Sequence, residues 1–227
     1  YEIAQCLVGS EMCIRDSAYA ERVFRKPGDI LTKTGMFARA FPIEGIRSIS
    51  TIELPHGEIA EVSATFRFPF ENAGYMHKGA IVTAKVDPLL EPAVPLADLL
   101  EKDVPERFYL GKDLEKWAYL KGSKKVLRTS RSGHQYTFSE GAIAFPDPLD
   151  RPARTMLTSE SSLNRSTHVI QDPQTGEMRL LTPVEAERIQ GFKDHWTDTG
   201  MPEKFRYFCM GNALVVPMVT RMGKVLG

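Results

Sequence analysis

Alternating apolar and polar positions predict two neighbouring strands in the first half of the chain. From Glu61 to Phe68 an apolar side chain recurs at every second position, and Gly79 to Asp87 is rich in β-branched residues. A period of two places alternate side chains on opposite faces of a sheet. The stretch ENAGYMHK between the two segments contains asparagine and glycine, which favour turns. The pattern therefore predicts a hairpin.

Helical signals dominate the later part of the chain. A short helix is expected from Leu96 to Glu101, and apolar residues from Pro105 to Leu120 can share one helical face. The strongest signal is Pro183 to Gln190, where Thr182 and Glu185 form a T-x-x-E capping box and proline takes the first helical position. A glycine follows, so this helix is predicted to end at once.

Short strands and two more helices complete the predicted elements. The last helix should carry Pro217 in its first turn, because proline inside a helix would kink it. The expected strands are Val126–Thr129, Gln135–Phe138, Arg154–Thr158, Thr167–Gln171 and Met178–Leu181. The two helices run from Pro202 towards Met210 and, after a break at Gly211-Asn212, through Val215, Val219 and Met222.

Composition places the chain among globular proteins. Its 227 residues are 42% hydrophobic and 26% charged, which suffices for a buried core and argues against disordered, collagen-like and coiled-coil proteins. It has no run of eighteen apolar residues, so no transmembrane span is expected. The three cysteines, Cys6, Cys13 and Cys209, show no metal-ligand or disulfide spacing, and a reducing, cytoplasmic setting is predicted.

Charge is informative only locally. Lysine plus arginine total 29 and aspartate plus glutamate total 29, so the net charge of zero gives no argument for nucleic acid. From Lys121 to Ser139, however, there are five cations and no acid. This asymmetry favours a loop that faces a polyanion, while a plain solvated loop is the alternative.

The amino end, Tyr1 to Ser17, has neither the charged start nor the cleavage site of a secretory signal. It resembles translated sequencing adapter at the edge of an assembled fragment. We therefore expect the natural protein to begin near Ala18, in the middle of a longer gene, and Cys6 and Cys13 to carry no information.

Two segments resemble conserved motifs of one enzyme family. RLLTPVEAERIQGF, Arg179 to Phe192, is similar to the ninth motif of DNA cytosine-5 methyltransferases, and FCMGNALVVPMV, Phe208 to Val219, is similar to their tenth. Order and spacing both match. RPARTMLTSESSLNRSTH, Arg151 to His168, looks like the end of the family's variable target-recognition domain, so the resemblance covers about Phe24 to Leu226.

The resemblance implies a reaction that this chain cannot complete alone. In the family, a cysteine thiolate adds to carbon 6 of a flipped cytosine, a glutamic acid assists at N3, and carbon 5 takes the methyl group of S-adenosylmethionine. The family's Gly-rich loop, Pro-Cys, Glu-Asn-Val and Gln-x-Arg-x-Arg motifs do not occur in this sequence. Cys209 follows Phe208 instead of proline and is expected to be a small buried residue. Glu71-Asn72 precedes alanine instead of valine and is expected to lie in a hairpin turn.

The resemblance also assigns candidate site residues, with no catalytic residue and no metal ligand among them. Asn212 is expected to cap the last helix and to touch S-adenosylmethionine. The cofactor-binding set is Gly211, Asn212 and Ala213, and the polar scaffold between domains is Arg179, Thr182, Glu185 and Arg188. The DNA-binding set is Lys124, Lys125, Arg128, Arg131, His134, Arg154, Thr155, Asn164 and Arg165, lysines for phosphates and arginine or asparagine for base edges.

These inferences combine into one interpretation. The fold class is α/β, of the S-adenosylmethionine-dependent methyltransferase type: a mixed α+β target-recognition domain at 18–165, then a segment at 166–227 whose helices pack on an absent Rossmann-like catalytic domain. The chain is expected to be the inactive C-terminal part of a bacterial or phage DNA methyltransferase. Its partners would be duplex DNA, the missing catalytic domain and a restriction endonuclease of the same system, with no membrane. The alternatives are a stand-alone DNA-recognition subunit and an RNA cytosine methyltransferase.

Overall fold

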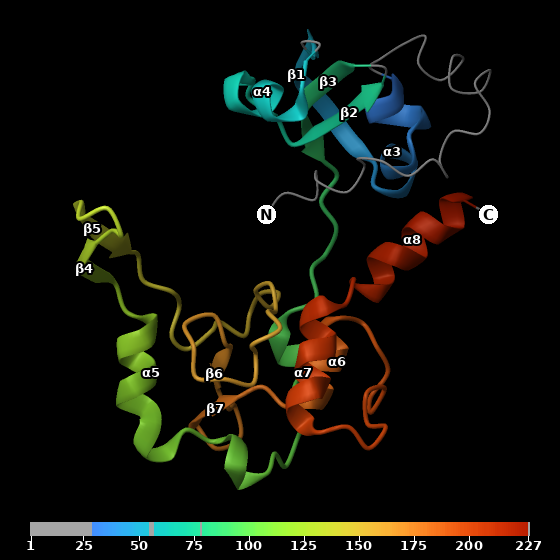
Figure 1. Cartoon of the computed structure of the whole chain (residues 1–227). Helices are drawn as coiled ribbons and strands as arrows, with labels where there is room; N and C mark the ends of the chain where they lie inside the picture. Colours follow the sequence, from blue (N-terminus) through green and yellow to red (C-terminus); the bar gives the residue numbers. More distant parts are fainter. Residues whose placement is uncertain (1–28, 55–56, 78, 227) are drawn as a thin grey trace. The chain divides into compact units, whose positions relative to one another are not determined.

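The computed structural model describes residues 29–54, 57–77 and 79–226, and the chain forms two compact units (Figure 1). The first unit is Tyr1–Glu91 with Thr220–Gly227, and the second is Pro92–Val219. This division does not fall at residue 165, where sequence motifs place a domain boundary. That boundary stays a prediction. Among the described residues, no helix has the length and apolar character needed to cross a membrane.

The first unit is built on a three-stranded antiparallel sheet of order β1-β3-β2. Its strands are β1 (Ile43–Glu53), β2 (Ala73–His77) and β3 (Ala80–Pro88). The central strand β3 provides most of the buried side chains, with Val82 and Ala84 at most 2% exposed. The strand predicted over Gly79 to Asp87 is therefore confirmed.

Two predictions for this unit are wrong. Residues 59–65 form the helix α4 (Ile59–Thr65) instead of a strand, and the stretch predicted as a turn contains β2, which pairs with β3. The apolar alternation misled because Phe66, Phe68 and Phe70 pack on one another, with ring centroids 5.8 to 6.3 Å apart, instead of lining one face of a sheet. Helix α4 has no buried residue, so its apolar residues do not show the helical spacing of a buried face.

The remaining helices of the first unit come from its first and last segments in sequence. They are η2 (Ile30–Thr34), α3 (Met36–Ala40) and the later turns of α8 (Val216–Leu226). Arg221 of α8 pairs with Glu91 at 2.5 Å and lies 5.7 Å from the Phe41 ring centroid. Pro217 is the second residue of α8, so its predicted place in the first turn is confirmed.

The second unit combines short helices with two hairpins. Leu96–Leu99, within the helix expected there, is a single 3-10 turn, and the strand expected at Arg154–Thr158 is wrong because this segment pairs with no other described strand. The other predicted strands and the capped helix are confirmed. The elements are η3 (Leu96–Leu99), η4 (Glu106–Phe108), η5 (Gly111–Asp113), α5 (Leu114–Lys121), β4 (Lys124–Thr129), β5 (Gln135–Glu140), β6 (Val169–Gln171), β7 (Met178–Leu180), α6 (Pro183–Ile189) and α7 (Glu203–Asn212).

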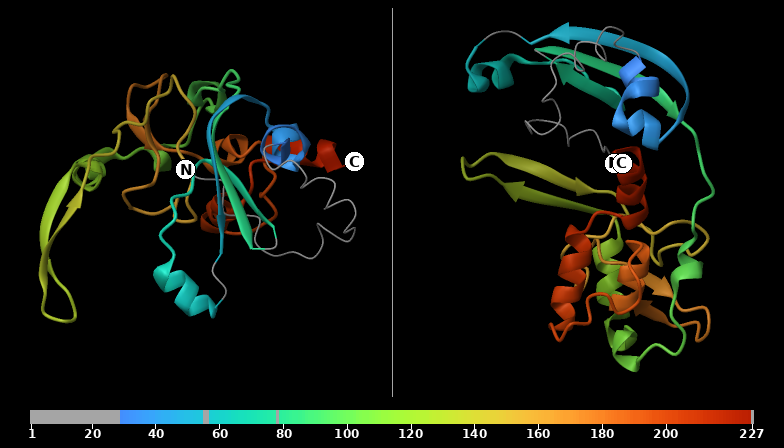
Figure 2. Two further views of the ribbon diagram at one scale, coloured as in Figure 1. Left: turned by 90° about the horizontal axis from the view of Figure 1, so that it is seen from above. Right: turned by 90° about the vertical axis from the view of Figure 1, so that its right-hand side faces the viewer.

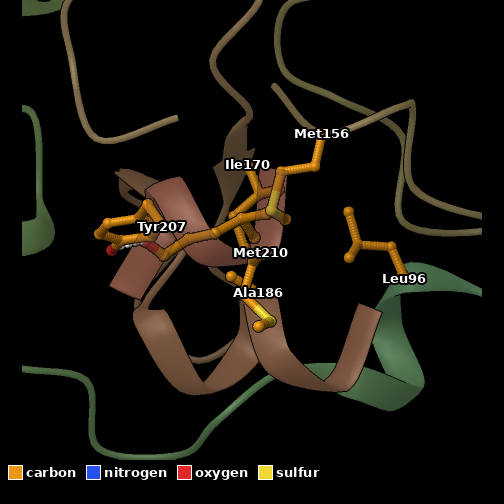
Figure 3. Close-up of a cluster of buried hydrophobic side chains, with 7 residues drawn as sticks. Leu96, Met156, Ile170, Ala186, Tyr207 and Met210 are labelled. Carbon is orange, nitrogen blue, oxygen red and sulfur yellow. Dashed lines mark hydrogen bonds between the residues drawn. The ribbon is translucent and has the colours of Figure 1, made fainter. Parts of the chain in front are cut away.

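The core of this unit lies between α6, α7 and the β6–β7 hairpin. Figure 3 shows the side chains of Ile170, Ala186, Tyr207 and Met210 gathered there, each at most 3% exposed. The Tyr207 hydroxyl donates to the Leu181 carbonyl at 2.6 Å, which satisfies its polar end. The β4–β5 hairpin lies outside this core and extends away from the helices (Figure 2). This core therefore holds α6, α7 and the β6–β7 hairpin together, and the β4–β5 hairpin projects from the second unit.

Candidate functional site

A buried arginine organises the β7–α6 segment. Arg179 on β7 has a fully buried side chain, which donates from Nε to Asp172 at 2.6 Å and from two further nitrogens to both oxygens of Glu185 at 2.8 Å. Burial alone would lower the pKa of Arg179, but the two carboxylates outweigh it and raise that pKa. The guanidinium therefore stays charged, and all its partners belong to this chain.

The capping box of α6 joins the same network. The Thr182 hydroxyl accepts from the Glu185 backbone N–H at 3.1 Å, and the Glu185 carboxylate accepts from the Thr182 N–H at 2.8 Å. Glu185 also accepts from the Glu101 N–H, while Arg188 pairs with Asp194 at 2.6 Å and donates to two carbonyls at the end of η3. The four scaffold candidates thus meet within the second unit. Their predicted role between two domains stays a prediction.

A second buried polar cluster lies at the root of the β4–β5 hairpin. Asp147 accepts from Arg154 at 2.5 Å and from the Val169 N–H at 2.9 Å, and the ammonium group of Lys121 lies 3.7 Å from it. Burial alone would raise the pKa of Asp147, but these hydrogen bonds hold it below its ordinary value. Burial lowers the pKa of Lys121. The expectation that Lys121 faces a polyanion is wrong, because its side chain is fully buried.

Two more DNA-binding candidates hold the chain's own backbone. Arg165 donates to the carbonyl of Gly122 at 3.1 Å, just before β4, and to that of Gly141, just after β5. Asn164 accepts from the Ser166 and Thr167 N–H groups at 2.8 and 3.1 Å. With Arg154 on Asp147, three predicted DNA contacts are engaged internally. Their part in DNA binding stays a prediction, and both strands of the hairpin are held at their root.

The remaining candidates are exposed, except Lys124, which is half-buried. The Lys124 ammonium lies 4.4 Å from the Tyr119 ring centroid and is half-buried, while the Arg128 guanidinium stacks 3.8 Å above the Phe138 ring. Lys125, Arg131, His134 and Thr155 are exposed. Along the hairpin the structure therefore brings together five of the nine predicted DNA contacts: Lys124, Lys125, Arg128, Arg131 and His134.

The segment at Gly211 to Ala213 ends α7. A Cβ atom on Gly211 would lie 2.3 Å from the Thr158 nitrogen, so this glycine permits close backbone contact. Asn212 is the last residue of α7, and its side chain donates to the Phe208 carbonyl at 2.9 Å. The prediction that Asn212 caps the following helix is wrong, because the first N–H of α8, on Val216, donates to Gln190 instead. The cofactor role of the three residues stays a prediction.

Comparison with known proteins decides the family. The family model described as C-5 cytosine-specific DNA methylase matches residues 60–227. The chain belongs to this family. It is 47% identical over 213 residues to "Type II methyltransferase M.Sau3AI" of Staphylococcus aureus, which covers 92% of this chain and 51% of that relative. The methylase chain thus spans about half the length of the curated relative that it matches.

Solved methyltransferases are among the structures similar to the methylase chain. A methyltransferase of Entamoeba histolytica, EhMeth, matches 79% of this chain and 53% of its own, at 14% identity and a TM-score of 0.40. The Dnmt2 methyltransferase of S. pombe matches 65% of this chain and 50% of its own, at 15% identity and a TM-score of 0.41.

Residues of this C-5 cytosine methylase that could be mistaken for reacting groups serve its packing. Cys209 is half-buried in α7 and packs against the core cluster. The Asn72 side chain extends the sheet, because it donates to the Val86 carbonyl at 2.9 Å and accepts from the Val86 N–H at 2.8 Å. No group of three or more metal-ligating side chains occurs in the described part of the chain.

The sequence analysis missed a buried contact between a histidine and a glutamate of this methylase. Nδ1 of His168 lies 2.9 Å from Glu160, and the same carboxylate oxygen accepts from the His168 backbone N–H at 2.6 Å. Within the described residues, Nε2 of His168 and the second Glu160 oxygen have no hydrogen-bond partner. No periodic signal could reveal this pair, since each residue lies in an irregular segment.

Proposed function

We propose that this chain is the C-terminal part of a DNA cytosine-5 methyltransferase. The whole enzyme transfers a methyl group from S-adenosylmethionine to carbon 5 of a cytosine flipped out of duplex DNA, as modification enzyme of a restriction-modification system. The family match and the partial coverage of a relative named a Type II methyltransferase support this proposal. Flipping is required because the thiolate and the methyl donor must approach carbons 6 and 5 from the faces of the ring, which neighbouring bases cover inside the stack.

The exposed cationic hairpin carries the proposal for this chain. Lys125, Arg128 and Arg131 are exposed, and no acid lies between Lys121 and Ser139 to neutralise them. Arg165 donates to backbone carbonyls next to the start of β4 and the end of β5, and so stabilises the base of the hairpin that carries these cations. Cations placed in this way neutralise phosphates and give salt-dependent affinity for duplex DNA.

The cofactor contacts proposed for this chain are Asn212 and the segment that joins α7 to α8. Gly211 lies against the backbone of Leu157 and Thr158, which leaves no room there for a ligand. The Asn212 side chain is exposed, and the neighbouring Leu214 and Val215 are 64% and 40% exposed. An amide and two apolar side chains fit the amino-acid end and the apolar surface of S-adenosylmethionine. When bound, the cofactor supplies an electrophilic methyl group, and Asn212 would orient its polar end.

DNA binding by the full chain tests the proposal. The affinity for a duplex oligonucleotide is measured at several salt concentrations, for the wild type and for Arg128→Ala combined with Arg131→Ala. Losing two phosphate contacts should reduce the slope of log affinity against log salt by about 2. Lys112→Ala combined with Lys204→Ala, two exposed lysines elsewhere, is the matched control and should leave the slope unchanged.

Unchanged affinity in the arginine variant would show that the hairpin does not contact DNA. Stronger binding of a tRNA than of the duplex would replace the proposal with an RNA cytosine methyltransferase. Transfer of labelled methyl groups from S-adenosylmethionine to duplex cytosine by the complete gene product tests the activity itself.

A further inference from the structure

The β4–β5 hairpin is a two-stranded ribbon whose register defines two faces. Residues directly opposite each other in an antiparallel pair point to the same side, and the side alternates along each strand. One face, here called the partnered face, holds the pairs Lys124–Glu140, Val126–Phe138 and Arg128–Tyr136. The other, here called the free face, holds the pairs Lys125–Ser139, Leu127–Thr137 and Thr129–Gln135.

The partnered face makes contacts within the chain. Arg128 stacks on Phe138, Lys124 lies over Tyr119 of α5, and Glu140 lies 3.7 Å from Arg165. Three of its six residues, Lys124, Phe138 and Glu140, are half-buried. Lys124 and Glu140 fix the ribbon to α5 and to the segment of Arg165, so the three half-buried side chains are less available to a partner. Arg128 stays exposed at this face.

The free face has no such contacts. All six of its residues are exposed, and Leu127 is 65% exposed. Within the described part of the chain, no polar side chain of this face makes a hydrogen bond or ion pair. It combines one ammonium group, one amide, three hydroxyls and one apolar side chain. This set can donate, accept and contact methyl groups, while its surroundings carry positive charge.

We infer that the free face is the base-reading surface, which enters the major groove of duplex DNA. The inference rests on the proposed function and adds the residues that select the sequence. A two-stranded ribbon fits the major groove, where glutamine pairs with adenine, lysine contacts guanine, and threonine or leucine contacts the thymine methyl group. Gln135, Thr137 and Lys125 therefore read base edges, and Arg131 at the turn holds phosphate.

The experiment selects bound duplexes from a pool with a randomised central sequence, using the full chain. Gln135→Ala and Thr137→Ala should relax the preference at one or two base positions, by roughly 5- to 150-fold in relative affinity. Their salt slope should stay that of the wild type, because they contact bases and not phosphates. Tyr136→Ala and Val126→Ala, neighbours on the partnered face, are the matched controls and should retain the wild-type preference.

The outcomes separate this inference from the proposed function. Absence of duplex binding by the wild type would overturn the proposed function. Duplex binding without any sequence preference, or a preference that survives Gln135→Ala and Thr137→Ala combined, would overturn the base-reading face alone. A preference lost in Tyr136→Ala but kept in Gln135→Ala would assign the reading to the partnered face. Thermal unfolding of each variant confirms that it is folded.

Discussion

The β7–α6 cluster and the β4–β5 ribbon use the same residue types in opposite ways. Arg179 is fully buried between Asp172 and Glu185, and its charge is neutralised within the chain. Lys125 and Arg131 on the ribbon are exposed and have no acid beside them. Arg179, in the segment that resembles a motif of the family, therefore stabilises the fold. Lys125 and Arg131, on the β4–β5 ribbon, remain available to a partner.

The same contrast occurs within five residues of sequence. Lys121 ends α5 with a fully buried ammonium group near Asp147, and Lys125 lies exposed on the next strand. Charge counting treats the two lysines alike. Their surroundings differ because Asp147 and Thr167 come from distant parts of the chain, and only the folded unit brings them to Lys121.

The largest effect is expected from Arg179→Met. It removes the buried cation and leaves Asp172 and Glu185 as uncompensated buried carboxylates, which should lower the free energy of unfolding by about 3–5 kcal/mol. Urea unfolding followed by tryptophan fluorescence measures it, since both tryptophans, Trp117 and Trp196, lie in the second unit.

The control is an exposed ion pair of the same unit. Arg107→Met breaks the pair with Glu203, whose side chains are 62% and 44% exposed, and should change stability by less than about 1 kcal/mol. Equal effects of the two arginine variants would contradict the structural role given to the β7–α6 cluster.

A smaller loss is expected from Gly211→Ala. The new Cβ would lie 2.3 Å from the Thr158 nitrogen and 2.4 Å from the Leu157 carbonyl carbon, so backbone must move, at a typical cost of about 1–3 kcal/mol. Gly141→Ala, where a Cβ meets no atom within 4 Å, should change stability by less than about 1 kcal/mol. If Gly211→Ala matches this control in urea unfolding, the glycine is not needed for packing.

Sequence patterns could predict what is encoded locally. The capping box of α6 was predictable because Thr182 and Glu185 are three residues apart and satisfy each other's backbone groups. The β4–β5 and β6–β7 hairpins follow from short β-prone pieces around turns. Helix α4 was missed because none of its apolar residues is buried, so their spacing does not define a buried face.

The site could be predicted only as a region. The cation-rich stretch is visible in the sequence, but which cations are free depends on contacts between distant residues. Arg165 was expected to bind DNA, yet it donates to carbonyls 24 and 43 residues away. The pairing register, which separates the free face from the partnered face, also cannot be read from composition.

The hairpin-root cluster should make stability depend on pH. The pKa of Asp147 is below its ordinary value because Arg154 and the Val169 N–H stabilise the carboxylate against the effect of burial. A group whose folded pKa is depressed stabilises the fold above its unfolded pKa, near 3.9, and loses that contribution as the pH falls towards the folded value. Stability should therefore decrease below about pH 4.

Asp147→Asn tests this assignment. The variant should be less stable at neutral pH, and its free energy of unfolding should change less steeply between about pH 5 and pH 2 than that of the wild type. Urea unfolding at each pH gives both quantities. Asp150→Asn, an exposed neighbour whose carboxylate lies 3.4 Å from Arg151, is the control and should keep the wild-type slope. A wild-type slope in Asp147→Asn would place the titrating group elsewhere.

The smallest effect on stability is expected on the ribbon. Lys125→Ala should change the free energy of unfolding by at most about 0.5 kcal/mol, because its side chain is exposed and has no ionic partner in the described chain. Lys121→Ala is the matched lysine, and it should be far more destabilising because it leaves Asp147 without one of its cations and the Thr167 carbonyl without its donor. Urea unfolding of both variants compares them directly. Similar losses would mean that Lys125 supports the fold, and the distinction between a free and a partnered face of the ribbon would then fail.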